Sequence, residues 1–308
     1  MRKLLVIIGS LLPFFLSAQT DTTNTTPKDT TLVAPKDTLW KVGGLGNLNF
    51  SQIALSNWAG GGESSISVTG LLDVFANYEK GKIHWDNRLN LGYGLLRQGE
   101  GGKVVKTDDK IDFSSQLGRE IRKNVSYVGY LGFRSQFDKG FNLPNDSVKI
   151  SDFLAPGYVI LSLGLKYKPV KWIKLYASPL TGKITIVNDQ TLADEGAFGV
   201  DPGEKVRTEF GGLVRVQIEK ELMENVSLST NVEAFSNYSE DPDHIDVNWE
   251  ALLAMKVNEF LTASITTNLI YDHDVKIGID ENNDGIIDKE GPRVQFKEVL
   301  SVGLSYKF

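Results

Sequence analysis

A run of acidic and amide residues near the C-terminal end of the chain has the clearest chemical signature. It follows the pattern D-x-N-x-D-G-x-x-D, and its predicted metal ligands are the side chains of Asp280, Asn282, Asp284 and Asp288 and the backbone carbonyl of Ile286. Ca²⁺ binds about six to eight oxygen ligands of these kinds, and a glycine at position 6 permits the sharp turn of such a loop. The acid expected at position 12 is replaced by Gly291. We therefore expect a structural Ca²⁺ site in a loop, and an ordinary acidic surface loop is the alternative.

Residues suited to enzymatic chemistry are scarce. The chain has three histidines, His84, His244 and His273, and no cysteine, which excludes disulfides and thiolate metal sites. It has no G-x-S-x-G nucleophile motif, and no glycine-rich sequence lies on a turn from a strand into a helix. We predict no catalytic residue and no organic cofactor. We expect His244 and His273 to be solvated residues of loops rather than metal ligands.

The elements that must position these residues are strands, as the alternation of residue types indicates. In the last eight residues, SVGLSYKF, the apolar Val302, Leu304, Tyr306 and Phe308 alternate with small or polar residues. Such alternation places one face of a strand against an apolar phase and the other against a polar one. A terminal strand that ends on an aromatic residue resembles the targeting strand of bacterial outer-membrane barrels. This resemblance implies that the barrel-assembly machinery recognises the strand of Phe308.

The same alternation recurs about twelve times from Trp40 onward. The predicted strands cover approximately 41–55, 65–79, 82–97, 108–121, 124–138, 155–168, 171–187, 204–222, 225–239, 244–257, 260–274 and 292–308. Five short connections alternate with six long ones, as in outer-membrane barrels with short periplasmic turns and long outer loops. A soluble β-sandwich would also alternate, but it has no reason to sort its loops in this way. We predict a closed antiparallel transmembrane β-barrel of about twelve strands, with both termini periplasmic.

The N-terminal region divides into two segments before the barrel. Residues 1–18 have two basic residues followed by an apolar run and are predicted to be a secretory signal peptide. Residues 19–39 are rich in Thr, Asp, Lys and Pro and are predicted to be a disordered periplasmic linker. Residues 40–308 form the barrel. The formal charge of −6 shows no basic excess, so a nucleic-acid partner is not expected.

If the apolar face of each strand meets lipid, the other face lines the bore. That face would carry Asp73, Asp86, Arg88, Arg134, Lys166, Lys174, Arg207, Glu209, Arg215, Glu219, Glu233, Glu250 and Lys256. Both signs are mixed, which does not favour a pore selective for cations or for anions. These charges either form an ion-pair network that fills the bore or line a narrow solute channel. Aromatic residues near the strand ends are expected to form girdles at the two membrane interfaces.

A distinctive motif lies where the first strand ends. The sequence NFSQIALSNWAGGGE, Asn49–Glu63, with Asn77 and Tyr78, resembles an uncharacterised family of bacterial outer-membrane proteins, the domain of unknown function 3078. The resemblance covers about residues 39–308. It implies a signal peptide, a β-barrel and no established activity, and it carries over no catalytic residue.

Three functional hypotheses follow from the sequence. In the first, the protein is a non-enzymatic outer-membrane β-barrel of a Gram-negative bacterium that acts as a narrow, porin-like solute channel. In the second, it is a structural or accessory subunit of an outer-membrane assembly, with a filled bore and a further outer-membrane protein as its partner. The third, an outer-membrane hydrolase, has the least support.

Overall fold

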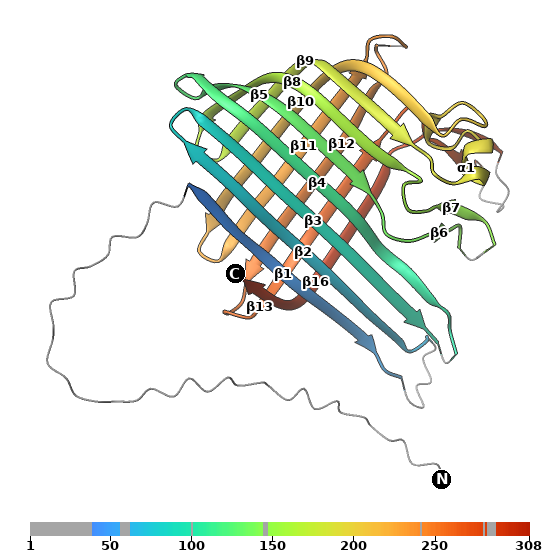
Figure 1. The fold of residues 1–308 in the computed structure, drawn as a ribbon. Helices are drawn as coiled ribbons and strands as arrows, with labels where there is room; N and C mark the ends of the chain where they lie inside the picture. Colours follow the sequence, from blue (N-terminus) through green and yellow to red (C-terminus); the bar gives the residue numbers. More distant parts are fainter. Residues whose placement is uncertain are drawn as a thin grey trace, which may run out of the picture. The chain divides into compact units, whose positions relative to one another are not determined.

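Twelve long antiparallel strands close into a barrel in the computed structural model, which describes residues 39–55, 62–99, 101–143, 147–240, 242–279, 281 and 288–308 (Figure 1). In chain order they are β1 (Trp40–Ile53), β2 (Ser65–Lys80), β3 (Ile83–Gln98), β4 (Val104–Arg122), β5 (Val125–Ser135), β8 (Gly157–Val170), β9 (Ile173–Ile186), β10 (Val206–Met223), β11 (Val226–Asn237), β12 (Ile245–Lys256), β13 (Leu261–Tyr271) and β16 (Gln295–Lys307). Each strand pairs with its neighbours in the chain, and β1 closes the ring against β16. The predicted fold and strand number are confirmed.

Short turns and long loops lie at opposite ends of the barrel, as the sequence predicts. The turns after β2, β4, β8, β10 and β12 lie at the end where β1 begins and β16 finishes (Figure 1). Gly81, Asn124 and Asn225 adopt positive φ angles in three of these turns. Glycine and asparagine tolerate that conformation, which allows the tight reversal.

The long loops contain short elements that the sequence patterns did not predict. They are the hairpins β6 (Gly140–Phe141) with β7 (Lys149–Ser151) and β14 (Lys276–Ile279) with β15 (Lys289–Pro292), the helix α1 (Gln190–Asp194) and the 3-10 turn η1 (Ala197–Gly199). They were missed because each is too short to show a periodicity. None of the helices in the described parts of the chain is long and apolar enough to cross a membrane.

The loop between β9 and β10 is anchored by Asp189, which caps α1. Its side chain accepts a hydrogen bond from the backbone N–H of Leu192 at 3.1 Å and is also paired with Lys149. The hydrogen bond from Lys149 lowers the pKa of the Asp189 carboxyl below its usual value. Leu192 and Val200 are buried in the small apolar cluster beneath this loop.

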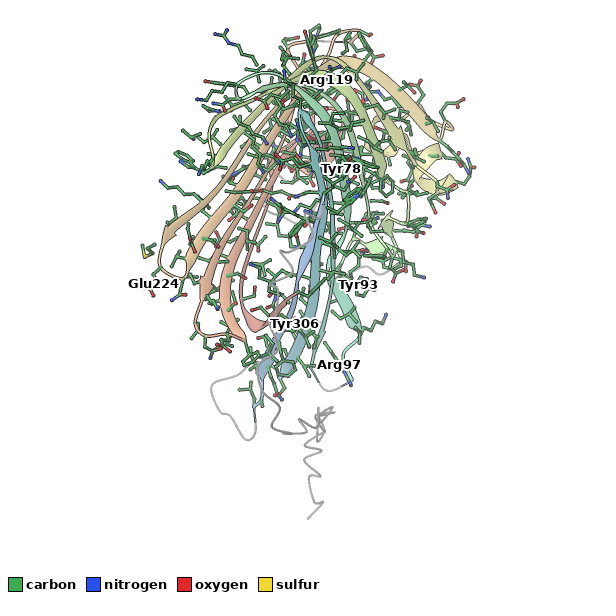
Figure 2. All side chains as sticks on the ribbon, turned by 60° about the vertical axis from the view of Figure 1, so that its left-hand side comes forward. Tyr78, Tyr93, Arg97, Arg119, Glu224 and Tyr306 are labelled. Atoms are coloured by element: carbon green, nitrogen blue, oxygen red, sulfur yellow. The ribbon has the colours of Figure 1, made fainter. Side chains whose placement is uncertain are left out.

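The outward face of the barrel is an apolar belt. On β8, Leu161, Leu163 and Tyr167 point outward and are 52%, 63% and 46% exposed, while Ser162 and Lys166 point inward and are buried. The same alternation runs through the other strands, and charged side chains such as those of Arg97, Arg119 and Glu224 lie at strand ends or turns (Figure 2). An exposed surface of this kind suits contact with lipid.

Aromatic side chains gather on the outward face near the end with the short turns. Trp40 packs against Tyr78 and Trp85, with ring centroids 5.2 and 5.6 Å apart. The Trp85 ring N–H donates to the Ser115 hydroxyl at 2.8 Å, which satisfies its polar group on an otherwise apolar face. This arrangement matches the aromatic girdle expected from the sequence.

Candidate functional site

The inward face of the barrel is the candidate functional site, because the charged side chains predicted to line the bore all point there. The strand register places every one of the thirteen on the side opposite to the apolar belt. Most of them form ion pairs with side chains of other strands, and some of these partner strands are not neighbours in the ring.

Two ion pairs cross the bore between strands that are not neighbours in the ring. The Lys110 ammonium on β4 lies 2.6 Å from a Glu250 carboxylate oxygen on β12, and the Arg88 guanidinium on β3 lies 3.3 Å from Glu219 on β10. Five strands separate β4 from β12 on either side of the ring, so the Lys110–Glu250 pair divides the bore into two halves. Lys110 was not among the predicted bore residues, although its place in the alternation of β4 marks it as inward.

A buried group of charges links β5, β10 and β11. Glu233 accepts contacts from two guanidinium groups, Arg134 at 3.0 Å and Arg215 at 3.0 Å. The Arg215 guanidinium also lies over the Tyr130 ring, 4.4 Å from its centroid. Glu233 and Arg215 are almost fully buried, so both depend on this pairing to offset the loss of water.

Apolar side chains complete the filling of the half formed by β5 and β8 to β11. The members of this cluster point inward and are buried: Val128, Tyr130, Ile160, Tyr176, Leu213 and Phe235. Most of these residues were not predicted to point inward, because apolar residues were expected on the outward face. A signal was present in Val159-Ile160-Leu161 and Leu213-Val214, because consecutive apolar residues in a strand place apolar groups on both faces.

The other half of the bore, formed by β13, β16, β1, β2 and β3, has a different lining. Its inward side chains are mostly small and neutral, and they are half-buried rather than buried; they include Asn47, Asn49, Ser67, Thr69, Thr262, Ser264, Thr266, Ser301 and Ser305. The hydroxyls of Thr262 and Ser305 lie 2.8 Å apart, and those of Ser264 and Ser301 lie 3.1 Å apart. We call this side the neutral half; its partial exposure means that water reaches it.

At the end with the long loops, an acidic cavity of about 160 Å³ opens beside the bore. Its lining includes Arg207, Glu209 and Asp274, and the rings of His244 and His273 stack at 3.5 Å. Arg207 is 2.6 Å from Asp274. The structure thus brings together the two histidines that were expected to be solvated loop residues. Among the described residues, no three His, Asp or Glu side chains have the geometry of a metal site.

The predicted Ca²⁺ loop lies largely outside the described residues. Asp280, Asn282, Asp284 and Ile286 belong to the part that is not described, as do the predicted signal peptide and all of the linker except its last residue. Asp288 is described, and its carboxylate accepts a hydrogen bond from the backbone N–H of Glu281 at 2.8 Å. The hairpin of β14 and β15 holds the two ends of this loop together.

The family resemblance is confirmed for part of the chain. Residues 50–141 match the model of a family described as a protein of unknown function (DUF3078), a shorter span than the sequence motif suggested. No curated protein matches the sequence.

Several solved structures are similar in fold. An outer membrane channel from Pseudomonas putida F1 has 11% identity and a TM-score of 0.39, over 92% of this chain and all of that chain. The translocator domain of the autotransporter NalP from Neisseria meningitidis has 11% identity and a TM-score of 0.33, over 89% and 90%. OmpF from Salmonella typhi has 9% identity and a TM-score of 0.27, over 87% and 97%.

Proposed function

We propose that this barrel spans the outer membrane of a Gram-negative bacterium and acts as a narrow, non-enzymatic channel for small uncharged solutes. Its short turns and both ends of the barrel would face the periplasm, and its long loops the outside. The apolar belt on the outward face supports this placement, because the barrel turns most of its charges inward and pairs most of its backbone groups between neighbouring strands.

The division of the bore carries the proposal of a channel. The Lys110–Glu250 pair separates a packed half from the neutral half, where most inward side chains are small, hydroxyl-bearing or amide-bearing, and half-buried. The charges that β2 and β3 add to this half are Asp73, Asp86 and Arg88, and Arg88 pairs with Asp73 at 2.8 Å. Such groups exchange hydrogen bonds with water and with sugars or similar solutes without attracting either sign of charge. A path along the neutral half would therefore conduct ions weakly and without strong selectivity.

A second candidate function is a structural or accessory subunit with a filled bore. The apolar cluster around Tyr130 and Leu213, together with the ion pairs that cross the bore, favours it. In both functions the strand that ends at Phe308 would be recognised by the barrel-assembly machinery, and a Ca²⁺ ion would stiffen the outer loop at Asp280–Asp288.

Conductance of the purified protein in a planar bilayer distinguishes the two functions. We expect small, reproducible steps from the wild type with little preference between cations and anions. Lys110→Ala combined with Glu250→Ala should raise the step size several-fold, because it removes the partition between the halves. Lys123→Ala, in a turn at the barrel end, is the control and should leave the steps unchanged. Silence from the folded wild type would reject the channel in favour of the filled scaffold.

A further inference from the structure

The seam where the barrel closes is paired over only part of its length. The register between β1 and β16 covers five residue pairs, from Leu45–Lys307 to Asn49–Gly303. Gly44 and Phe308 add two backbone hydrogen bonds of 3.0 and 3.1 Å at the end with the short turns. Beyond Asn49, the strands diverge toward the end with the long loops (Figure 1). No other pair of neighbouring strands in the described barrel has so short a register.

The divergence leaves backbone groups at two facing edges. Phe50–Ile53 of β1 pair only with β2, and Gln295–Val302 of β16 pair only with β13. The backbone N–H and C=O of Gly44 both hydrogen-bond to Phe308. In an antiparallel ladder every second residue directs these groups toward the same neighbouring strand, so the N–H and C=O of Phe50 point toward the gap. Each such group left unpaired in hydrocarbon costs several kcal/mol, so this part of the wall needs hydrogen-bonding partners.

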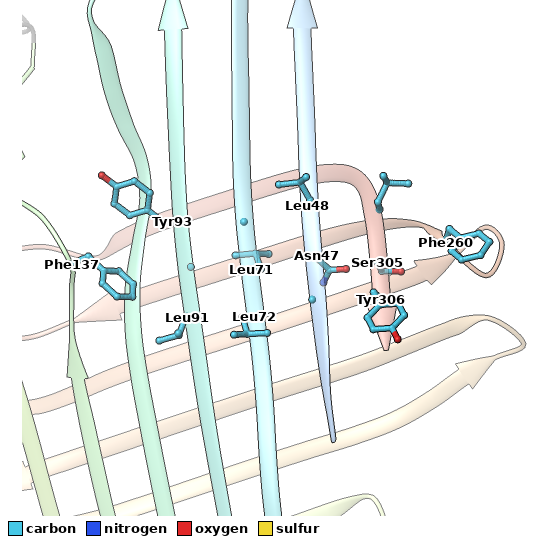
Figure 3. A pocket seen from close by; sticks show the side chains of 14 residues that line it. Asn47, Leu48, Leu71, Leu72, Leu91, Tyr93, Phe137, Phe260, Ser305 and Tyr306 are labelled. Carbon is cyan, nitrogen blue, oxygen red and sulfur yellow. The ribbon is translucent and has the colours of Figure 1, made fainter. Parts of the chain in front are cut away.

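The outward side of the seam carries an apolar groove. A hollow of about 690 Å³ runs over β16, β1, β2 and β3, walled by Leu48, Leu72 and Tyr306 (Figure 3). It exists because Gly46 and Gly70, which lie on the outward face between these residues, have no side chain. The groove is continuous with the apolar belt, and its chemistry suits a hydrocarbon chain.

The inward side of the seam is polar and uncharged. Ser51 on β1 and Ser301 on β16 point into the neutral half, and the segments Phe50–Ile53 and Leu300–Val302 contain no charged residue. The charges next along β16 are Lys297, which pairs with Asp108 at 2.8 Å, and Glu298. A charged ligand beside Ser51 and Ser301 would thus find no counter-charge in these two segments; Lys297 and Glu298 lie farther along the same edge of β16.

We propose that the gap between β1 and β16 is a lateral opening that binds an uncharged amphiphile from the bilayer. The head group hydrogen-bonds to the free backbone edges and to Ser51 and Ser301, and the chain lies in the groove over Gly46. This deepens the proposed function, because the opening leads into the neutral half. A closed form of the seam would extend its register to Phe50–Val302 and Gln52–Leu300, which keeps lipid-facing residues outside and places Ser51 beside Ser301 inside.

Fluorescence quenching in bilayers tests the opening. A bimane label is placed on Ser301→Cys, beside the gap, or on Ser305→Cys, in the paired part of the same strand; the chain has no cysteine of its own. The probe is stearic acid amide of amino-TEMPO, an uncharged amphiphile whose nitroxide head quenches bimane. We expect several-fold stronger quenching at position 301 than at 305, and no such difference with a long-chain trimethylammonium nitroxide. Equal quenching at both positions by the uncharged probe would overturn the proposal. The same excess of quenching at position 301 with the cationic probe would also overturn it.

A disulfide tests the closure. Ser51→Cys with Ser301→Cys is compared with Asn47→Cys with Ser305→Cys, a pair already in register. The control pair should oxidise readily, and the test pair several-fold more slowly, because separated strands cannot meet disulfide geometry.

Once oxidised, the test pair should abolish binding of the uncharged nitroxide, measured by its mobility in the spin-resonance spectrum, and leave axial conductance intact. Unchanged binding of the uncharged nitroxide after complete oxidation would reject the lateral opening. A wild type that shows no conductance would reject only the proposed channel.

Discussion

At the scale of single residues, the inside of this barrel is governed by the cost of burying charge. Glu233 holds two guanidinium groups at 3.0 Å in a region where its side chain is 5% exposed. Removing one partner of such a group leaves an uncompensated charge, which costs much more than the pair itself contributes. Glu233 is therefore expected to be highly sensitive to substitution.

We expect Glu233→Gln to destabilise the barrel by about 3–5 kcal/mol, because Arg134 and Arg215 lose their shared counter-charge. Thermal unfolding followed by heat-modifiable migration on a gel measures the effect. Glu224→Gln, at an exposed turn position, serves as the control and should leave the unfolding midpoint in place. A midpoint equal to that of the wild type for Glu233→Gln would show that water hydrates this group of charges.

At the scale of elements, each strand separates the apolar outer surface from the bore, because successive side chains point to opposite faces. On β8, Leu163 lies on the outward face near the middle of the strand, and Tyr167 lies on the same face near the short turn. If the outward belt meets lipid, depth in the membrane determines what a charge costs at each place.

Leu163→Arg should destabilise the protein in a bilayer by about 2–4 kcal/mol, whereas Tyr167→Arg at the interface should cost about 0–1 kcal/mol. Urea-induced unfolding in lipid vesicles measures both. Equal costs at the two positions would contradict a membrane-spanning arrangement of β8.

The loop between β14 and β15 is the element that the Ca²⁺ hypothesis concerns. Added Ca²⁺ should raise the melting temperature of the wild type, because bound ligand stabilises the folded state by mass action. Asp280→Ala with Asp284→Ala should abolish that shift, and Asp243→Ala, in a different outer loop, should retain it. A wild type whose melting temperature does not respond to Ca²⁺ has no such site.

At the scale of the whole molecule, the sorting of connections defines two unlike ends. We expect an epitope inserted at Gly203, in a long loop, to be labelled by antibody on intact cells. An epitope at Lys123, in a short turn, should be labelled only after the outer membrane is permeabilised. The reverse pattern would invert the proposed orientation. The same two insertions test the outer-membrane location, since neither would be reached on intact cells if the protein were elsewhere.

Alternation and turn length in the sequence were enough to predict the twelve strands, their two faces and the inward position of all thirteen charges. These properties depend on residues close in the chain, where the period of two decides which face a side chain joins. The opposite pairs Lys110–Glu250 and Arg88–Glu219, the inward apolar cluster and the short seam between β1 and β16 depend instead on how the ring closes. Only the tertiary structure decided them, because the stagger of the strands in the closed ring brings together residues that no local pattern relates. The same stagger determines over how many residues the last strand pairs with the first.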